Sequence, residues 1–255
     1  MNRRNFLNAA ALSAAAGLAS GAVAPVKSRR VIEAVAFDGF AVFDPRPIGT
    51  LAEELFPGNG AALMLSWRTR QFEYGWLRTL TGSYVDFWHV TADALRFACA
   101  ALKLDLTPVK QERLMDGHLA LKAWPDVLPA LQSLRAAGVR LALLTNFTAA
   151  MQSANIRVAG LEDFFEARLT TDAVKAYKPD PRSYQMGVDH FKLPRSAIAF
   201  AAFGGWDAVG AKRFGFPVYW CNRLGQPGEE LGVAADRVAP TLAGLPAFVG
   251  AASYS

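Results

Sequence analysis

The sequence predicts an α/β fold in which a Rossmann-like parallel sheet core carries an inserted all-helical cap subdomain. Three observations lead to this fold class. A short apolar run, Val31–Phe37, stops abruptly at the carboxylate Asp38, as expected of a buried strand that delivers a polar side chain to the end of a parallel sheet. Helical periodicity then dominates from about Gly60 to Lys122. Strands and helices alternate along the rest of the chain.

The first residues read as a targeting segment rather than as part of the fold. Arg3 and Arg4 precede Phe6-Leu7, an Ala- and Leu-rich run covers Ala9–Leu18, and small residues follow up to Ala24. This pattern predicts a signal peptide over residues 1–24, and the paired arginines resemble a twin-arginine export signal, which implies the twin-arginine export machinery as a partner and a periplasmic location. A fortuitous basic, alanine-rich helix is the alternative. The apolar run is too short for a comfortable membrane span, which needs about 20 residues.

Composition excludes some classes of function. The chain has 255 residues, 52% of them hydrophobic, and its net charge of +5 falls to +3 once the two arginines of the signal are removed. Basic residues are scattered and do not alternate with aromatic ones, so nucleic-acid binding is not expected, whereas a small anionic substrate is compatible with the charge.

Cys99 and Cys221 lack CxxC spacing. They could form a disulfide or remain buried free thiols, and the second interpretation is favoured.

The residue two places after Asp38 restricts the chemistry. Phosphoryl-transfer enzymes built on a strand of this kind place a second Asp there, which protonates the leaving oxygen. This chain has Phe40, and a phenyl ring transfers no proton. The sequence therefore favours attack by Asp38 on a carbon atom whose leaving group needs no proton.

Helices are predicted between the first strand and residue 122. A helical region begins at Ile48, and apolar residues at helical spacing predict three further helices, over Ala61–Leu80, Phe87–Leu102 and Pro108–Leu121. These helices form the expected cap, residues 49–122. The expected core comprises residues 31–48 and 123–250.

Alternating strands and helices are predicted after residue 123. The predicted helices cover Asp126–Ala137, Ala149–Ala159, Ser183–Phe191 and Ala208–Phe214, and three of them end at a glycine, a common helix terminator. The predicted strands cover 139–144, 197–203 and 217–221, with the last of these as the final strand.

Polar residues follow several of these segments. They are Asp38, Thr145-Asn146, the loop Gly204–Asp207 and the loop Ala176–Pro181, which contains Lys178. Ligands of open parallel sheets bind at the carboxyl ends of the strands, next to the point where the strand order reverses. We therefore expect these four segments to meet in one crevice.

The order and spacing of Asp38, Leu144-Thr145-Asn146, Tyr177–Pro181 and Trp206-Asp207 resemble the haloacid dehalogenase superfamily over nearly all of the chain after the signal. The segment Trp67–Arg78 resembles the first cap helix of the L-2-haloacid dehalogenases (type II). Residues 84–88 resemble the segment that follows it in that subfamily. The resemblance implies hydrolytic dehalogenation of short-chain L-2-haloacids to 2-hydroxyacids, with inversion and without a metal or other cofactor.

The resemblance also implies roles for the catalytic residues. Asp38 would attack the carbon atom and form an ester that water later splits. Arg68 and Asn146 would receive the departing halide as a charged fork and an amide donor. Lys178 would hold Asp38 ionised, and Asp207 would pair with Lys178 and orient or deprotonate the water. Thr145 completes the expected catalytic set, offering a hydroxyl to the substrate carboxylate or to Asp38.

A second set of residues is expected to bind the substrate or support the site. Aromatic side chains would wall a dry pocket, in which charges interact more strongly than in water, and Tyr184 matches a position that supports the lysine region. The aromatic residues are Phe40, Phe72, Phe87 and Trp206. Each of these residues also has a purely structural interpretation. The aromatic residues could belong to the ordinary core, Arg68 could be a solvated charge on a helix, and Asp207 could be the N-cap of the following helix.

The sequence departs from the subfamily in several polar groups. The usual Asp-x-Tyr-Gly-Thr reads Asp38-Gly39-Phe40-Ala41-Val42, so two hydroxyls are lost. The usual Ser-x-Asn reads Ala202-Phe203-Gly204, and Thr69 stands where Gln is common. These changes leave two alternatives open: a phosphatase-like hydrolase of the same superfamily, and a non-catalytic periplasmic binder of small carboxylates. The subfamily's cap-bearing members are often dimers, so a homodimer is one option for the assembly.

Overall fold

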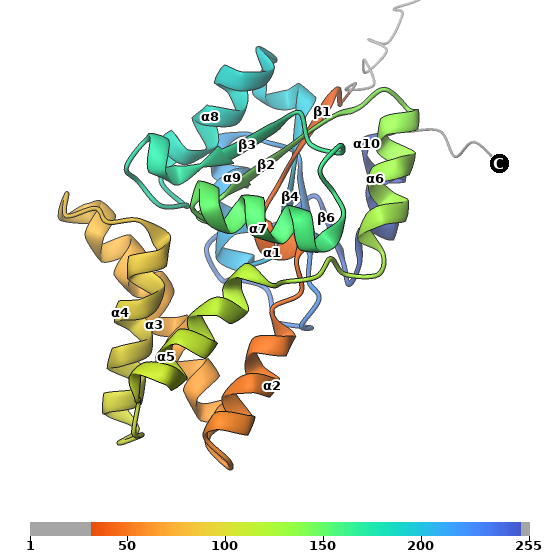
Figure 1. Ribbon diagram of the computed structural model, residues 1–255. Helices are drawn as coiled ribbons and strands as arrows, with labels where there is room; N and C mark the ends of the chain where they lie inside the picture. The colour runs from red at the N-terminus through yellow and green to blue at the C-terminus, as the bar shows by residue number, and fades with distance from the viewer. Residues whose placement is uncertain (1–31, 251–255) are drawn as a thin grey trace, which may run out of the picture.

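A six-stranded parallel sheet forms the centre of the protein (Figure 1). The structure is a computed structural model that describes residues 32–250, so the predicted signal peptide, residues 1–24, lies outside the described residues. The strands lie in the order β3-β2-β1-β4-β5-β6 and every neighbouring pair is parallel. Their bounds are β1 Ala34–Phe37, β2 Arg140–Thr145, β3 Ala167–Thr170, β4 Ile198–Ala202, β5 Val218–Cys221 and β6 Arg237–Ala239. The predicted α/β class is confirmed.

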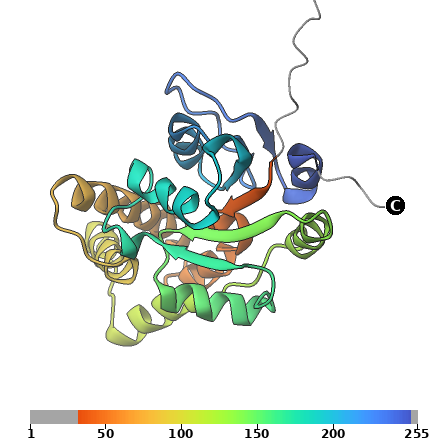
Figure 2. The ribbon, with the colours of Figure 1, turned by 90° about the horizontal axis from the view of Figure 1, so that it is seen from above.

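Helices cover both faces of this sheet, as the view from above shows (Figure 2). On one face, α6 (Val127–Ala136), α7 (Ala149–Ala159) and α10 (Leu245–Val249) pack against alternate strand residues such as Val35 and Phe37. On the other, α8 (Pro181–Phe191) and α9 (Gly205–Phe214) cover the remaining ones. Burial on both faces explains why the strands read as continuous apolar runs.

The strand order reverses at β1, and this fixes the position of the site. β1 pairs with β2 on one side and with β4 on the other, so Phe37 lies between Leu143 and Ala201. The chain therefore winds outward in opposite directions from β1, which opens a crevice at the carboxyl ends of the three central strands.

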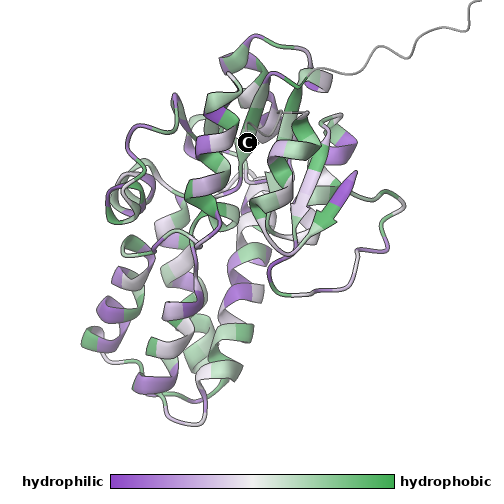
Figure 3. Ribbon diagram, turned by 90° about the vertical axis from the view of Figure 1, so that its right-hand side faces the viewer, coloured by the Kyte–Doolittle hydropathy of each residue, from purple (hydrophilic) through white to green (hydrophobic). Residues whose placement is uncertain are grey.

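Four helices form the cap beneath the carboxyl ends of the strands: α2 (Arg46–Leu55), α3 (Gly60–Leu80), α4 (Phe87–Ala101) and α5 (Pro108–Asp116) (Figures 1 and 3). The chain leaves the core and re-enters it side by side, because Phe43 and Ala123 form an antiparallel bridge. The predicted boundary between core and cap, after residue 48, falls inside α2. This helix begins earlier, at Arg46, and Pro47 in its first turn is well suited to begin a helix.

Two strands and two α-helices, one of them α10, were not predicted from the sequence. The prediction that 217–221 is the final strand is wrong, because β6 follows it. β6 is only three residues long and largely exposed, and the edge strand β3 is only partly buried, so neither shows the apolar run of a central strand. The four-residue helix α1 (Gly39–Val42) begins directly after Asp38.

Cys99 and Cys221 are both buried and free, which confirms the favoured interpretation of the two cysteines. Among residues 32–250, no helix has the length and apolar character needed to cross a membrane.

Candidate active site

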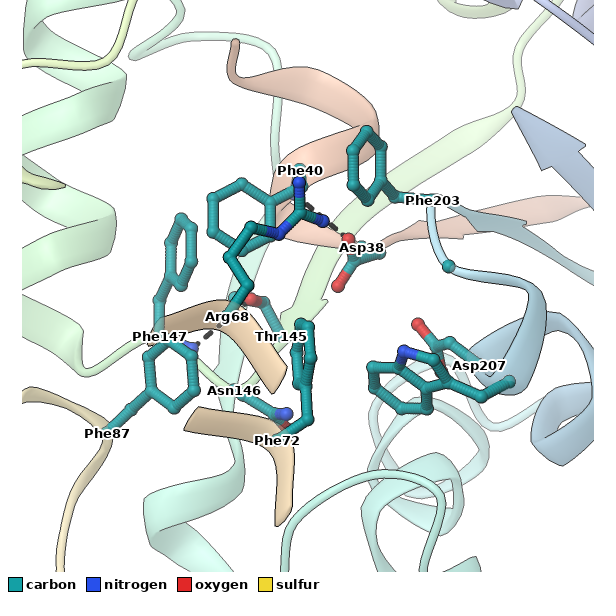
Figure 4. A pocket seen from close by; sticks show the side chains of 12 residues that line it. Asp38, Phe40, Arg68, Phe72, Phe87, Thr145, Asn146, Phe147, Phe203 and Asp207 are labelled. Carbon is teal, nitrogen blue, oxygen red and sulfur yellow. Dashed lines mark hydrogen bonds between the residues drawn. The ribbon is translucent and has the colours of Figure 1, made fainter. Parts of the chain in front are cut away.

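A small cavity of about 30 Å³ lies between the carboxyl ends of the strands and the cap (Figure 4). Nine of the predicted site residues line it: Asp38, Phe40, Arg68, Phe72, Phe87, Thr145, Asn146, Trp206 and Asp207. Three further lining residues, Phe147, Phe203 and Gly204, were not among the predicted site residues. The sequence carried a signal for them, because each is adjacent to a predicted residue or to the altered loop that follows β4.

Asp38 reaches the cavity from the end of β1, and both of its carboxylate oxygens are held. Oδ2 accepts a hydrogen bond from the backbone N–H of Phe40 at 3.0 Å, so the side chain caps helix α1. Oδ1 accepts from Nζ of Lys178 at 2.6 Å. Gly39 permits this turn, because a Cβ atom there would lie 2.8 Å from Oγ1 of Thr145. The carboxylate is thus fixed in one orientation.

Lys178 lies behind the cavity, completely buried, between the two carboxylates of the site. Its Nζ is 2.6 Å from Asp38 and 2.6 Å from Oδ2 of Asp207. Burial alone would lower the pKa of Lys178, but the attraction of the two carboxylates outweighs it and the pKa is raised, so the ammonium stays charged. The predicted Lys178–Asp207 pair is confirmed.

Burial governs Asp207 as well. It raises the pKa of this carboxyl to about 6; the Lys178 ammonium opposes the rise and the negative charge of Asp38 adds to it. Asp207 is not the N-cap of its helix, since Gly204 holds that position and Asp207 lies in the first turn of α9. Its carboxylate instead accepts hydrogen bonds from Lys178 and from Tyr184.

Tyr184, which the sequence groups with the residues that bind the substrate or support the lysine region, does not line the cavity. The side chain is fully buried among the aromatic residues beneath the sheet, and its hydroxyl donates to Oδ1 of Asp207 at 2.7 Å. Tyr184 lies within α8, whose Asp180 cap and Pro181 set the register of the helix. Its contact with the site therefore runs through Asp207.

Arg68 enters the cavity from the cap helix α3 and remains available to an anion. Its guanidinium forms no hydrogen bond or ion pair with any of residues 32–250, and it lies 5.6 Å from the centre of the Phe203 ring. Burial lowers the pKa of Arg68, while the charge of Asp38 opposes this. By contrast, Arg70 and Arg78, which sequence analysis did not place in the site, pair with Glu73 and Asp93.

Thr145 and Asn146 follow β2 at the edge of the cavity. Oδ1 of Asn146 accepts from the backbone N–H of Lys178 at 3.2 Å, which directs the amide nitrogen away from that bond. Oγ1 of Thr145 accepts from the N–H of Phe147 at 3.2 Å, which leaves its own proton to donate. Both residues thus present a hydrogen-bond donor at the end of β2.

Aromatic rings enclose the polar groups. Phe40 packs edge-on against Phe147 with ring centres 4.9 Å apart, and it also lies 5.7 Å from Phe203. From the cap side, the Phe72 ring lies 5.0 Å from the ring of Trp206. Such a wall excludes water, so charges inside the cavity interact more strongly than in bulk solvent. Among residues 32–250, no group of three or more His, Cys, Asp or Glu side chains is placed to hold a metal ion.

Known proteins are similar to this chain in both sequence and fold. Residues 22–215 match the haloacid dehalogenase-like hydrolases. An (S)-2-haloacid dehalogenase of Pseudomonas sp. (strain YL) is 41% identical over 80% of this chain and 89% of its own length. A haloacetate dehalogenase of Moraxella sp. (strain B) is 38% identical over 83% of this chain and 95% of its own. An L-2-haloacid dehalogenase from Xanthobacter autotrophicus, solved with chloropropionic acid covalently bound, superposes with a TM-score of 0.80 at 31% identity, covering 88% of this chain and all of that one. The chain therefore belongs to the haloacid dehalogenase-like hydrolase family.

Proposed function

We propose that the protein hydrolyses the carbon–halogen bond of short-chain L-2-haloacids and releases 2-hydroxyacids through an ester on Asp38. One observation carries the proposal: the Asp38 carboxylate, fixed at both oxygens, shares a small aromatic-walled cavity with the guanidinium of Arg68. A nucleophile and an anion receiver are thus placed in one dry compartment. The relatives named as dehalogenases support the same reaction.

The first step forms the ester. An oxygen of Asp38 attacks C2 of the haloacid from the side opposite the halogen; the new C–O bond forms as the carbon–halogen bond breaks, which inverts C2. The halide leaves with the bonding electron pair and is received by Arg68 and the amide of Asn146. No proton is required by the leaving group, which agrees with the presence of Phe40 where an acid would otherwise be needed.

The second step splits the ester. Water attacks the carbonyl carbon of the Asp38 ester, and Asp207 takes its proton. A pKa of about 6 leaves Asp207 mostly ionised at neutral pH while keeping it a stronger base than an exposed aspartate. The bond between the Asp38 carbonyl carbon and the substrate oxygen breaks, and Asp207 returns its proton to that oxygen, so the product leaves as the 2-hydroxyacid. The second proton of the water is lost from the Asp38 carboxyl group to solvent, and the Asp38 carboxylate is restored beside Lys178.

The phosphatase alternative fits this site less well. Mg²⁺ is held by oxygen ligands in near-octahedral array, and the two carboxylates of this site each already bond to the Lys178 ammonium. The binder alternative needs no ester on Asp38. The three functions therefore differ in what can be measured: chloride release, hydrolysis of an aryl phosphate, or haloacid binding without chemistry.

The test is one turnover of the purified protein with L-2-chloropropionate in chelator-treated buffer, followed by intact mass and by chloride release. We expect chloride release and a transient mass increase located on Asp38, both absent in Asp38→Asn. Mg²⁺-dependent hydrolysis of an aryl phosphate without chloride release would replace this function by the phosphatase. Thermal stabilisation by haloacids without chemistry would replace it by the binder.

Export and assembly complete the proposal. The Arg3-Arg4 pattern and the apolar segment after it support export by the twin-arginine machinery to the periplasm. Replacing both arginines by lysine should leave the precursor in the cytoplasmic fraction, and unchanged fractionation would contradict export by this route.

Three exposed leucines on α3 support a homodimer: Leu65, Leu77 and Leu80. Light scattering of the purified protein tests it, and a monomer mass at micromolar concentration would contradict it.

A further inference from the structure

Helix α1 connects the nucleophile to the rest of the protein. Its residues Gly39–Val42 are all buried, and their side chains are hydrogen or hydrocarbon only, so none of them forms a hydrogen bond. The orientation of the helix therefore depends on its backbone groups. A helix leaves its last carbonyls without partners inside the helix, and here the carbonyls of Phe40 and Ala41 are in this position.

Two side chains from distant parts of the chain occupy these carbonyls. Nε1 of Trp124, just before α6, donates to the carbonyl of Phe40 at 3.1 Å. Nη2 of Arg223, just after β5, donates to the carbonyl of Ala41 at 2.8 Å. The backbone N–H of Trp124 also donates to the carbonyl of Val42 at 3.1 Å. The carboxyl end of α1 is thus held by three donors.

The two donors also hold each other. The Arg223 guanidinium lies 4.6 Å from the centre of the Trp124 ring and forms hydrogen bonds of 2.8 and 3.0 Å to the two carboxylate oxygens of Asp126. Asp126 in turn accepts from the backbone N–H of Leu242 at 2.7 Å. The Arg223 side chain is only 3% exposed. A buried, bidentate arginine stacked on an indole has little freedom to move.

Phe40 transmits this arrangement to the nucleophile. Its N–H donates to Oδ2 of Asp38, while its carbonyl accepts from Trp124. A rotation of α1 that broke the second bond would also displace the first. Attack on carbon requires the carboxylate oxygen in line with the breaking bond, and a displacement of about 1 Å costs about a hundredfold in rate.

We propose that Trp124 and Arg223 are positioning residues that set the orientation of the Asp38 carboxylate by holding the carboxyl end of α1. This inference rests on the proposed dehalogenase function, which it deepens by assigning the pair to ester formation. Neither side chain lines the cavity, so their loss should slow ester formation and change haloacid binding little.

The variants Trp124→Phe and Arg223→Met remove one donor each while keeping a ring or an apolar stem. Two matched controls lose the same kind of contact elsewhere. Arg140→Met removes a bidentate bond to Glu166, a bond to the carbonyl of Phe191 and a stacked ring, all at the amino end of β2. Tyr219→Phe removes one donor to the carbonyl of Thr241.

Two measurements decide the proposal. Single-turnover ester formation on L-2-chloropropionate should fall about tenfold or more in Trp124→Phe and Arg223→Met, with KM within about threefold of the parent, and Arg223→Lys should recover part of the rate. The controls should stay within about threefold. The second measurement is hydrogen exchange of the Phe40 amide by NMR, which should quicken in the two test variants and stay unchanged in the controls.

The results of these two measurements distinguish the positioning role from the proposed dehalogenase function. Loss of rate no greater than in the controls overturns the positioning role while leaving the dehalogenase function intact. If the parent protein releases no halide, the proposed function fails, and exchange of the Phe40 amide alone decides: faster exchange in the test variants supports the pair, and unchanged exchange overturns it. A rise in KM without a change in ester formation also overturns it, because the pair would then act on binding.

Discussion

Nζ of Lys178 lies 2.6 Å from Oδ1 of Asp38 and has no contact with solvent. The two residues are 140 positions apart in the chain, so only the fold brings them together. Burying a carboxylate without a partner of opposite charge is costly, and an ion pair offsets that cost. The Lys178 ammonium therefore compensates the negative charge of the Asp38 carboxylate beside a cavity that aromatic rings line.

Replacing Lys178 by methionine should abolish ester formation and destabilise the fold. Two carboxylates would be left buried near each other, and loss of one partner of a buried ion pair costs about 3–5 kcal/mol. Halide release and the midpoint of urea unfolding measure the two effects. The exposed neighbour Lys175→Met is the control and should change neither. Ester formation at the parent rate in Lys178→Met would contradict the role given to the ammonium.

Asp207→Asn should separate the two chemical steps. In the proposed mechanism, ester formation uses Asp38 and Arg68, whereas hydrolysis needs a base for water. Halide should therefore be released once, and the covalent adduct should persist. Removal of a general base slows its step by about 10²–10⁴-fold. Intact mass after mixing with L-2-chloropropionate measures the adduct, with Asp189→Asn on the exposed side of α8 as the control. A variant without any adduct would instead assign Asp207 to the first step.

The rate of ester hydrolysis should fall as the pH drops below about 6, since protonated Asp207 takes no proton from water. At pH values well below 6, the rate of ester hydrolysis should fall by nearly tenfold for each pH unit.

Asp207 should also make the stability of the fold depend on pH, because the pKa of Asp207 is higher in the folded chain than in the unfolded chain. This group therefore contributes stability at low pH, below its ordinary value of 3.8, and that contribution is lost as the pH rises through about 6. The pH dependence of unfolding, compared with Asp207→Asn, measures it. Equal pH dependence in both proteins would refute the shift.

In Tyr184→Phe, the rate of ester hydrolysis should begin to fall at a higher pH than in the parent protein. The Tyr184 hydroxyl donates to the ionised form of Asp207 and so lowers its pKa; without this bond the pKa rises further. The stability loss should be modest, about 0.5–1.5 kcal/mol, as for one hydrogen bond. Tyr219→Phe, which also loses one hydroxyl donor, should leave the pH dependence of ester hydrolysis unchanged. An unshifted profile in Tyr184→Phe would show that the tyrosine serves packing alone.

Arg68→Met should slow halide departure by about 10²–10³-fold, as expected when one group that stabilises developing charge is removed. Arg68→Lys should recover only part of the rate, because an ammonium lacks the planar fork of donors. Pre-steady-state halide release measures the step. Arg70→Met, whose arginine pairs with Glu73 on the same helix, is the control. Similar rates of halide release in Arg68→Met and Arg70→Met would show that Arg68 has no role in receiving the halide.

Local pattern was enough to identify much of the candidate site. Asp38 ends an apolar run, and Thr145-Asn146 ends another, so strand termini alone place them at one edge of a parallel sheet. Phe203 and Phe147 escaped because an aromatic residue after a strand reads equally well as core. The order of the strands and the partners of Tyr184 depend on long-range packing, which no local pattern contains.

The sequence by itself determined the alternation of strands and helices, the inserted cap and the residues at the strand ends, because hydrophobic periodicity and residue type are local properties. Tertiary structure decided the rest. It placed Lys178 between Asp38 and Asp207, turned Tyr184 away from the cavity, and brought Trp124 and Arg223 to the carbonyls of α1. Each of these relations joins residues remote in the chain, and its energy depends on burial and distance, which exist only once the sheet and the cap have closed around the site.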